Sequence, residues 1–214
     1  MSECIQIDIV SDVVCPWCVI GYRQLEQALS ETGIAAEVQW HPFELNPKMP
    51  PEGQNLGDHL AEKYGTTPEQ SVAARQRLSD LGAELGFVFD FSDDARMVNT
   101  FQAHQLVEWA DQLGQQSKVK LALFKAHFSD GQDVSDIDTL VAIATEIGLD
   151  GDAARAALES EKMAWNVRTM QQFWIEKGVS GVPAMVFDKQ HLLSGAQGAK
   201  NYVTLLRRLN DARA

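Results

Sequence analysis

Two cysteines separated by two residues carry the clearest chemistry in this sequence. Cys15 and Cys18 enclose Pro16 and Trp17, and this spacing allows the two thiols to close a small, reversible disulfide. Since the thiolate is the form that attacks a disulfide, such a pair needs surroundings that favour a negative sulfur. The motif therefore predicts thiol-disulfide exchange.

A zinc site is the main alternative for cysteines at this spacing, and it requires a second pair of ligands. Cys4 stands alone upstream, and the five histidines are scattered at positions 41, 59, 104, 127 and 191. Because these residues do not supply a second pair at ligand spacing, we expect no metal. Cys4 is interpreted as a small apolar residue that leads into the first strand.

The elements around the thiol pair predict where it lies. Apolar and polar residues alternate over 5–10, helical spacing follows from Cys18 to Gly33, and a second alternating run covers 36–40. This βαβ order places Cys15 at a helix N-terminus, where backbone N–H groups and the helix dipole stabilise a thiolate. Pro16 suits the first turn because its missing N–H has no partner to lose there.

The middle of the chain has a different pattern, with one amphipathic helix after another. The period then returns to strands at 184–187 and 191–193, and an amphipathic helix at 202–209 ends the chain. Neither end segment could bury its strands alone, so the two must form one sheet. The expected helices between them cover residues 56–64, 68–85, 96–113, 117–128, 137–147, 152–158 and 161–177.

These patterns predict an α/β fold of the order β-α-β, a large all-helical insertion, then β-β-α. The expected domains are a discontinuous sheet domain of residues 1–45 and 179–214 and an inserted helical domain of residues 46–178.

A second element that bears on chemistry is Gly181-Val182-Pro183, directly before the late strand. A proline that opens a strand after a glycine favours a cis peptide in a tight turn, with an ordinary trans proline as the alternative. A cis bond would leave the Val182 backbone available to pair with an extended substrate.

Charge and hydropathy narrow the classes of partner. The net charge is −12, so a phosphate backbone or an anionic membrane surface would be repelled. Uninterrupted apolar stretches stay well short of the ~18 residues that a membrane span needs, and the start lacks a basic, apolar signal segment. We expect a cytoplasmic protein that binds neither nucleic acid nor membranes; the oligomeric state stays open.

Several motifs together resemble those of the DsbA family in the thioredoxin superfamily, across nearly the whole chain. More narrowly, they resemble the FrnE-like cytosolic oxidoreductases. The ordered set is more specific than the thiol pair alone. It comprises Ser11-Asp12-Val13-Val14-Cys15-Pro16-Trp17-Cys18 with Ile20-Gly21, then Pro42-Phe43-Glu44-Leu45-Asn46-Pro47, Asn99-Thr100 with Ala103-His104, and Ser194-Gly195-Ala196-Gln197.

The resemblance implies a thioredoxin-like fold with an inserted helical cap and a disulfide oxidoreductase or isomerase activity. It implies that Cys15 is an exposed nucleophile, Cys18 the resolving thiol, and Pro183 a cis-proline facing the disulfide. Trp17 and Val182 would line the surface where substrate docks. The implied partners are protein thiols and disulfides or small thiols such as glutathione, and no bound cofactor is expected beyond the Cys15–Cys18 disulfide.

Two other functions remain open. The kappa-class glutathione transferases and hydroxychromene-carboxylate isomerases share this plan, but they carry serine in place of Cys15. They also typically have an aspartate where this chain has Gln197. A chaperone-like binding module, with incidental thiols, is the non-enzymatic alternative.

Further candidates for the substrate site are Pro16, Asn99, His104 and Gln197, although a hydrogen-bonded structural role is the alternative for His104. Asp12 is interpreted as a helix-capping residue.

His41 and Glu44 follow the second strand. They either frame the entrance to the site or are solvated loop residues.

Overall fold

The computed structural model describes residues 4–213 and divides into two compact units. The sheet unit runs up to Leu45 and resumes at Met170, and the helical unit is Asn46–Thr169. The second division falls within helix α8 (Ala164–Glu176), whereas the sequence pattern places the end of the insertion at residue 178.

The sheet unit is built on a mixed sheet with strand order β2-β1-β5-β6. Strand β1 pairs in parallel with β2 and antiparallel with β5, which in turn pairs antiparallel with β6. The element order confirms the predicted β-α-β start and β-β-α end. The strands are β1 Ile5–Ser11, β2 Ala36–Pro42, β5 Ala184–Phe187 and β6 His191–Ser194.

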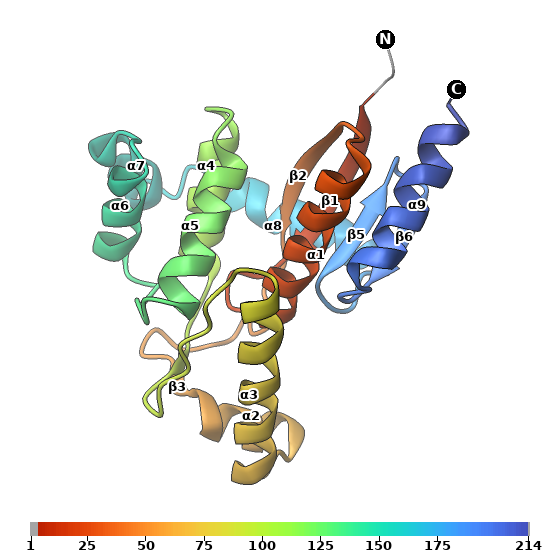
Figure 1. Ribbon diagram of the computed structural model, residues 1–214. Coiled ribbons are helices and arrows are strands. Elements are labelled where there is room, and N and C mark those ends of the chain that lie inside the picture. Colours follow the sequence, from red (N-terminus) through yellow and green to blue (C-terminus); the bar gives the residue numbers. More distant parts are fainter. Residues whose placement is uncertain (1–3, 214) are drawn as a thin grey trace. The chain divides into compact units, whose positions relative to one another are not determined.

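Helices α1 (Pro16–Thr32) and α9 (Ala199–Asp211) lie side by side in the sheet unit (Figure 1). The parallel β1–β2 pair requires a crossover, which α1 supplies. Gly33 ends α1 in the left-handed conformation, with φ of 64°. Aromatic contacts from Tyr22 to Trp40 and from Tyr202 to Phe187 join the two helices to one face of the sheet.

The opposite face of the sheet packs against α8. Val10 of β1 and Ala184 of β5 are paired in register, and both belong to a buried cluster with Trp174 and Val179. The polar residues of β1 therefore do not all face solvent, since Asp8 lies on the same face as Val10.

The helical unit consists largely of helices with recognisable caps. Asn55, Thr67, Asp136 and Asp150 each accept a backbone N–H at a helix start. The helices are α2 Leu56–Tyr64, α3 Pro68–Glu84, α4 Phe101–Asp111, α5 Gln116–Phe128, α6 Ile137–Glu146, α7 Gly151–Glu159 and the first part of α8.

The predicted helix over 96–113 is wrong at its start. Arg96–Met97 forms strand β4, which pairs antiparallel with β3 (Gln54–Asn55), and α4 begins only at Phe101. The Asn99 side-chain oxygen accepts the Phe101 N–H at 3.0 Å. That local bond competes with helical continuation through this segment, which explains the later start.

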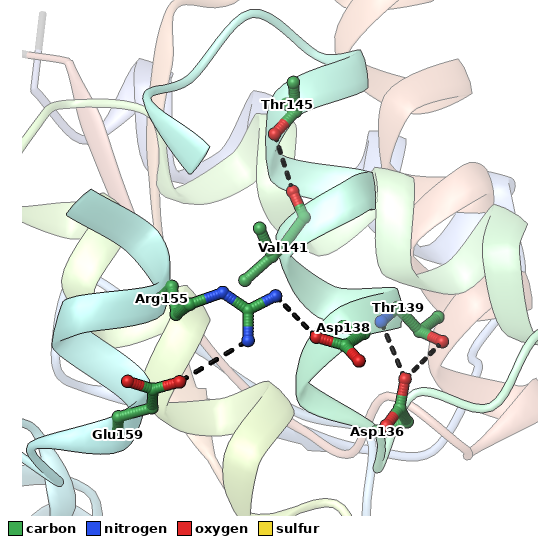
Figure 2. A network of polar contacts seen from close by, with 7 residues as sticks. All are labelled: Asp136, Asp138, Thr139, Val141, Thr145, Arg155 and Glu159. Atoms are coloured by element: carbon green, nitrogen blue, oxygen red, sulfur yellow. Dashed lines mark hydrogen bonds and ion pairs between the residues drawn. The ribbon is translucent and has the colours of Figure 1, made fainter. Parts of the chain in front are cut away.

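An ion-pair network joins α6 and α7 (Figure 2). Arg155 lies 2.5 Å from the Asp138 carboxylate and 3.4 Å from that of Glu159, while Asp136 caps α6 by accepting the Thr139 N–H. These groups are largely exposed, so the network fixes the register of the two helices more than it adds to the free energy of unfolding.

Substitution of Gly82 by alanine is expected to destabilise the helical unit. A Cβ there would lie 2.5 Å from Phe89 Cδ2 and 2.7 Å from the Phe87 carbonyl oxygen. Overpacking of this kind costs about 1–3 kcal/mol and outweighs the ~1 kcal/mol gain in helix propensity. Chemical denaturation should show the loss for Gly82→Ala. The exposed control Glu84→Ala should stay within ~0.5 kcal/mol of wild type, and equal stability of all three proteins would contradict the packing argument.

Candidate functional site

The thiol pair lies at the junction between β1 and α1. Cys15 immediately precedes α1, Pro16 is its first residue, and the Cys18 N–H donates to the Cys15 carbonyl at 3.0 Å. This placement agrees with the prediction that Cys15 begins a helix. Cys4, Cys15 and Cys18, all within the described chain, are thiols in the structure.

Cys15 differs from the exposed nucleophile that the resemblance implies. Its side chain is only 4% exposed, and Cys18 is 0% exposed. The Cys15 sulfur turns toward the Val182 carbonyl oxygen and donates its S–H across 3.6 Å. Trp17, between the cysteines, is the accessible member of the motif, with 38% of its surface exposed.

Strand pairing explains why Val182 meets Cys15. Val10 at the end of β1 pairs with Ala184 at the start of β5, so residues 182 and 183 lie where the chain leaves β1 for the thiol pair. The Val182–Pro183 peptide bond is cis. Pro183 is buried and Val182 is half-buried, and the carbonyl of Val182 is the group that contacts the Cys15 sulfur.

Asp12 does not have the predicted capping role. Its side chain is 0% exposed, and Oδ2 accepts the Leu45 N–H at 2.7 Å. Its carbonyl accepts the Cys15 N–H at 3.3 Å. Asp12 therefore links the turn that carries Cys15 to the segment following β2.

His41 lies within β2 and not after it, Glu44 follows the strand, and neither is a solvated loop residue. Glu44 is 4% exposed, and its N–H donates to the Gln171 side chain at 3.2 Å. His41 Nε2 lies 2.7 Å from Asp8 Oδ1, and its ring packs 4.9 Å from that of Trp174. The alternating pattern of β1 predicts which face of the sheet Asp8 occupies, but it does not predict that His41 is its partner.

The other candidates have more limited support. Gln197 is exposed in the loop after β6, within the sheet unit. Asn99 binds the Met49 carbonyl through its side-chain amide, and His104 is 2% exposed on α4. Both belong to the helical unit, so a role for them beside the thiols stays a prediction.

Sequence patterns did not single out Tyr202, a buried residue of α9 close enough to Cys18 for their charges to interact. Burial raises the pKa of Tyr202 to about 12; the Gln197 N–H bond opposes this effect, and a negative Cys18 adds to it. Tyr202 therefore remains a neutral hydroxyl near pH 7. Its only sequence signal was membership of the amphipathic stripe.

The raised pKa of Tyr202 predicts a pH-dependent stability. An unfolded tyrosine ionises near pH 10, whereas the folded residue keeps its proton to about pH 12, so the stabilisation is complete below pH 10 and lost as pH rises through 12. Between pH 9 and pH 12 the free energy of unfolding, measured by denaturation, should fall by about 2–3 kcal/mol less in Tyr202→Phe than in wild type. If the free energy of unfolding depends on pH in the same way in both proteins, the raised pKa of Tyr202 is contradicted.

Metal binding and membrane insertion are two further classes of function on which the described residues bear. Within residues 4–213, groups of three or more His, Cys, Asp or Glu side chains suited to a metal ion are absent. Among the described helices, none is long and apolar enough to cross a membrane.

The mixed sheet, the thiol pair at the start of α1 and the proline that opens β5 define a thioredoxin-like protein with an inserted set of helices. The profile of the family described as DSBA-like thioredoxin domain matches residues 6–209. The chain belongs to this family, which confirms the predicted fold class and supports disulfide oxidoreductase activity at the general level.

Individual relatives agree with this assignment. The probable DsbA oxidoreductase SCO1869 of Streptomyces coelicolor is 30% identical and superposes with a TM-score of 0.91 over 98% of this chain and 92% of its own. The uncharacterized protein YwbO of Bacillus subtilis (strain 168) is 27% identical over 195 residues, 91% of this chain and 92% of that protein. The cytosolic disulfide reductase DsbM of Pseudomonas aeruginosa, solved with GSH, shares the fold at 18% identity, with a TM-score of 0.66 over 95% of this chain and 98% of its own.

Proposed function

We propose that this protein is a cytoplasmic thiol-disulfide oxidoreductase of the FrnE-like type that works through Cys15 and Cys18. The observation that carries the proposal is the placement of Cys15 at the start of α1, with its sulfur 3.6 Å from the Val182 carbonyl next to Pro183. A helix N-terminus stabilises the thiolate that exchange requires. The Ser11-Asp12 to Cys18 motif supports the FrnE-like subtype.

The reaction proceeds in two exchange steps. The Cys15 thiolate attacks one sulfur of a substrate disulfide, forms a mixed disulfide and releases the other substrate sulfur as a thiolate. The Cys18 thiolate then attacks the Cys15 sulfur, so that the Cys15–Cys18 disulfide forms and the second substrate thiolate leaves. The substrate gains two electrons and the thiol pair loses two; the reverse sequence oxidises a dithiol substrate.

Trp17, Val182 and Pro183 are the proposed docking residues for the substrate. Trp17 offers an exposed aromatic surface between the cysteines, and the half-buried Val182 borders the reacting sulfur. An extended peptide can pair with backbone groups at such a strand end. Pro16, Asn99, His104 and Gln197 remain secondary candidates for this role.

Glutathione is the proposed small-thiol co-substrate in this scheme, which requires no bound cofactor. DsbM, which shares the fold, was solved with GSH and is a cytosolic disulfide reductase; these facts support both the small-thiol partner and the cytoplasmic location as proposals. The glutathione transferase alternative has less support. The kappa-class transferases carry serine at the position of Cys15, and they typically have aspartate at the position of Gln197.

The test uses the wild-type protein and a fluorescent peptide disulfide. We expect catalysed reduction of the peptide by glutathione, together with a Cys15–Cys18 disulfide detectable by mass spectrometry in oxidising glutathione buffer. If the protein neither accelerates the exchange nor forms this disulfide, the proposed function is wrong.

A further inference from the structure

The loop after β6 joins three elements of the sheet unit behind the thiol pair. The Gly195 N–H donates to the Pro183 carbonyl at 2.7 Å, and the Gly198 N–H donates to the Gln24 side-chain oxygen on α1 at 2.8 Å. We call Ser194–Gly198 the support loop. One of its ends is thus bonded to the residue next to Val182, and the other is bonded to α1, the helix that directly follows Cys15.

Tyr202 secures the middle of the support loop. Its hydroxyl accepts the Gln197 N–H at 3.4 Å and donates to the Gly195 carbonyl at 3.5 Å, and its side chain is 0% exposed. The ring packs toward Phe187 of β5. Since the hydroxyl is neutral near pH 7, it acts through these bonds and does not accept the proton of a thiol.

Gly21 allows the loop to approach α1 closely. A Cβ at this position would lie 3.2 Å from Pro183 Cγ and 3.7 Å from Ala196 Cα. The absence of a side chain at Gly21 therefore lets Pro183 and the support loop pack directly against α1, the helix that follows Cys15 and contains Cys18.

We propose that the support loop holds the Val182 carbonyl against the Cys15 thiol, and that Tyr202 and Gln24 are the positioning residues that keep the loop in place. This inference rests on the proposed function for its significance in exchange. Only a thiol can donate to the Val182 carbonyl, because a disulfide sulfur has no proton. The support loop thus favours the reduced pair over the disulfide.

The redox equilibrium between the thiol pair and glutathione measures this effect. The Cys15 and Cys18 dithiol reacts with one molecule of glutathione disulfide to give the Cys15–Cys18 disulfide and two molecules of glutathione, a two-electron oxidation of the protein. A variant with a loosened support loop loses the S–H contact, and its equilibrium moves toward the disulfide.

The experiment compares Tyr202→Phe and Gln24→Ala with the control Tyr22→Phe. Tyr22 is also a largely buried tyrosine of the sheet unit, but its hydroxyl bonds to Glu26 on the same helix. We expect both loop variants to shift the equilibrium constant with glutathione about 2–5-fold toward the disulfide, the range expected for one weak S–H···O contact. The control should match wild type.

A second readout needs only the reduced thiol. Alkylation of Cys15 by iodoacetamide, followed by mass spectrometry, should be faster by a similar factor in both loop variants, because the sulfur loses its carbonyl partner. If Tyr202→Phe fails to fold, Gln24→Ala carries the comparison on its own, because it leaves the buried ring in place.

The outcomes separate this inference from the proposed function. Loop variants that match Tyr22→Phe in both measurements would overturn the inference, whether or not wild type catalyses exchange. If wild type shows no exchange but the loop variants are alkylated faster, the role of the support loop is upheld and the proposed function is overturned.

Discussion

Replacement of Cys15 by serine is expected to abolish disulfide exchange, with a fall in rate of at least ~10³-fold. Serine is close to cysteine in size and can occupy the same place before α1, so the fold should be retained. Its oxygen, however, cannot form a mixed disulfide, and Cys18, which is 0% exposed, is not placed to meet a large substrate in its stead. The reduction of a fluorescent peptide disulfide by glutathione measures the effect.

Cys4→Ser is the matched control for this experiment. Cys4 is partly exposed near the start of β1, and its sulfur lies 4.0 Å from the carbonyl of neighbouring Ile5. The same chemical change there should leave the exchange rate within about twofold of wild type, since Cys4 lies outside the proposed reaction. Exchange that survives in Cys15→Ser but fails in Cys4→Ser would move the reactive thiol to Cys4 and overturn the mechanism.

The sequence predicted the elements that position the site because strong periodic patterns define them. The alternation around Ile7 and the helical spacing up to Gly33 placed Cys15 at a strand-to-helix junction, as the structure has it. Pro183 was likewise expected at the start of a strand. The need of each end segment to bury its strands then joined the two in one sheet, and the family resemblance added the expectation that Pro183 faces the thiol pair.

The contacts made around these elements were harder to predict. Strands β3 and β4 are two residues each, too short for a period, so Arg96 was assigned to a helix. Asp12 has a residue type typical of a cap, yet its carboxylate accepts a backbone N–H from Leu45, a partner that depends on tertiary packing. The pairing of Asp8 with His41 likewise depends on the register between neighbouring strands.

The burial of Cys15 follows from a long-range contact of the same kind. A CxxC motif shows that the thiols are close to one another, but the direction of the Cys15 sulfur depends on Val182, which lies far along the chain. The resemblance implied exposure, whereas the side chain is 4% exposed. For a substrate disulfide to reach this sulfur, the S–H contact with the Val182 carbonyl must give way.

Replacement of Cys18 by alanine is expected to arrest the reaction at the mixed disulfide. In the wild-type protein the Cys18 thiol lies one turn into α1 and attacks the Cys15 sulfur within the same molecule, a step favoured by proximity over attack by a thiol from solution. Without Cys18 the mixed disulfide should persist at least ~10²-fold longer. Non-reducing gels and mass spectrometry of the adducts measure this persistence.

The trapped adducts also distinguish the proposed function from its alternatives. Protein adducts on Cys15 that are absent from the double variant Cys15→Ser/Cys18→Ala would establish exchange with protein substrates. Adducts of glutathione alone, with turnover of a small aromatic substrate retained in Cys18→Ala, would instead favour the transferase or isomerase branch. A chaperone-like module would give neither adduct, and both variants would suppress aggregation as well as wild type, because helices that hold unfolded chains do not need the sulfur atoms.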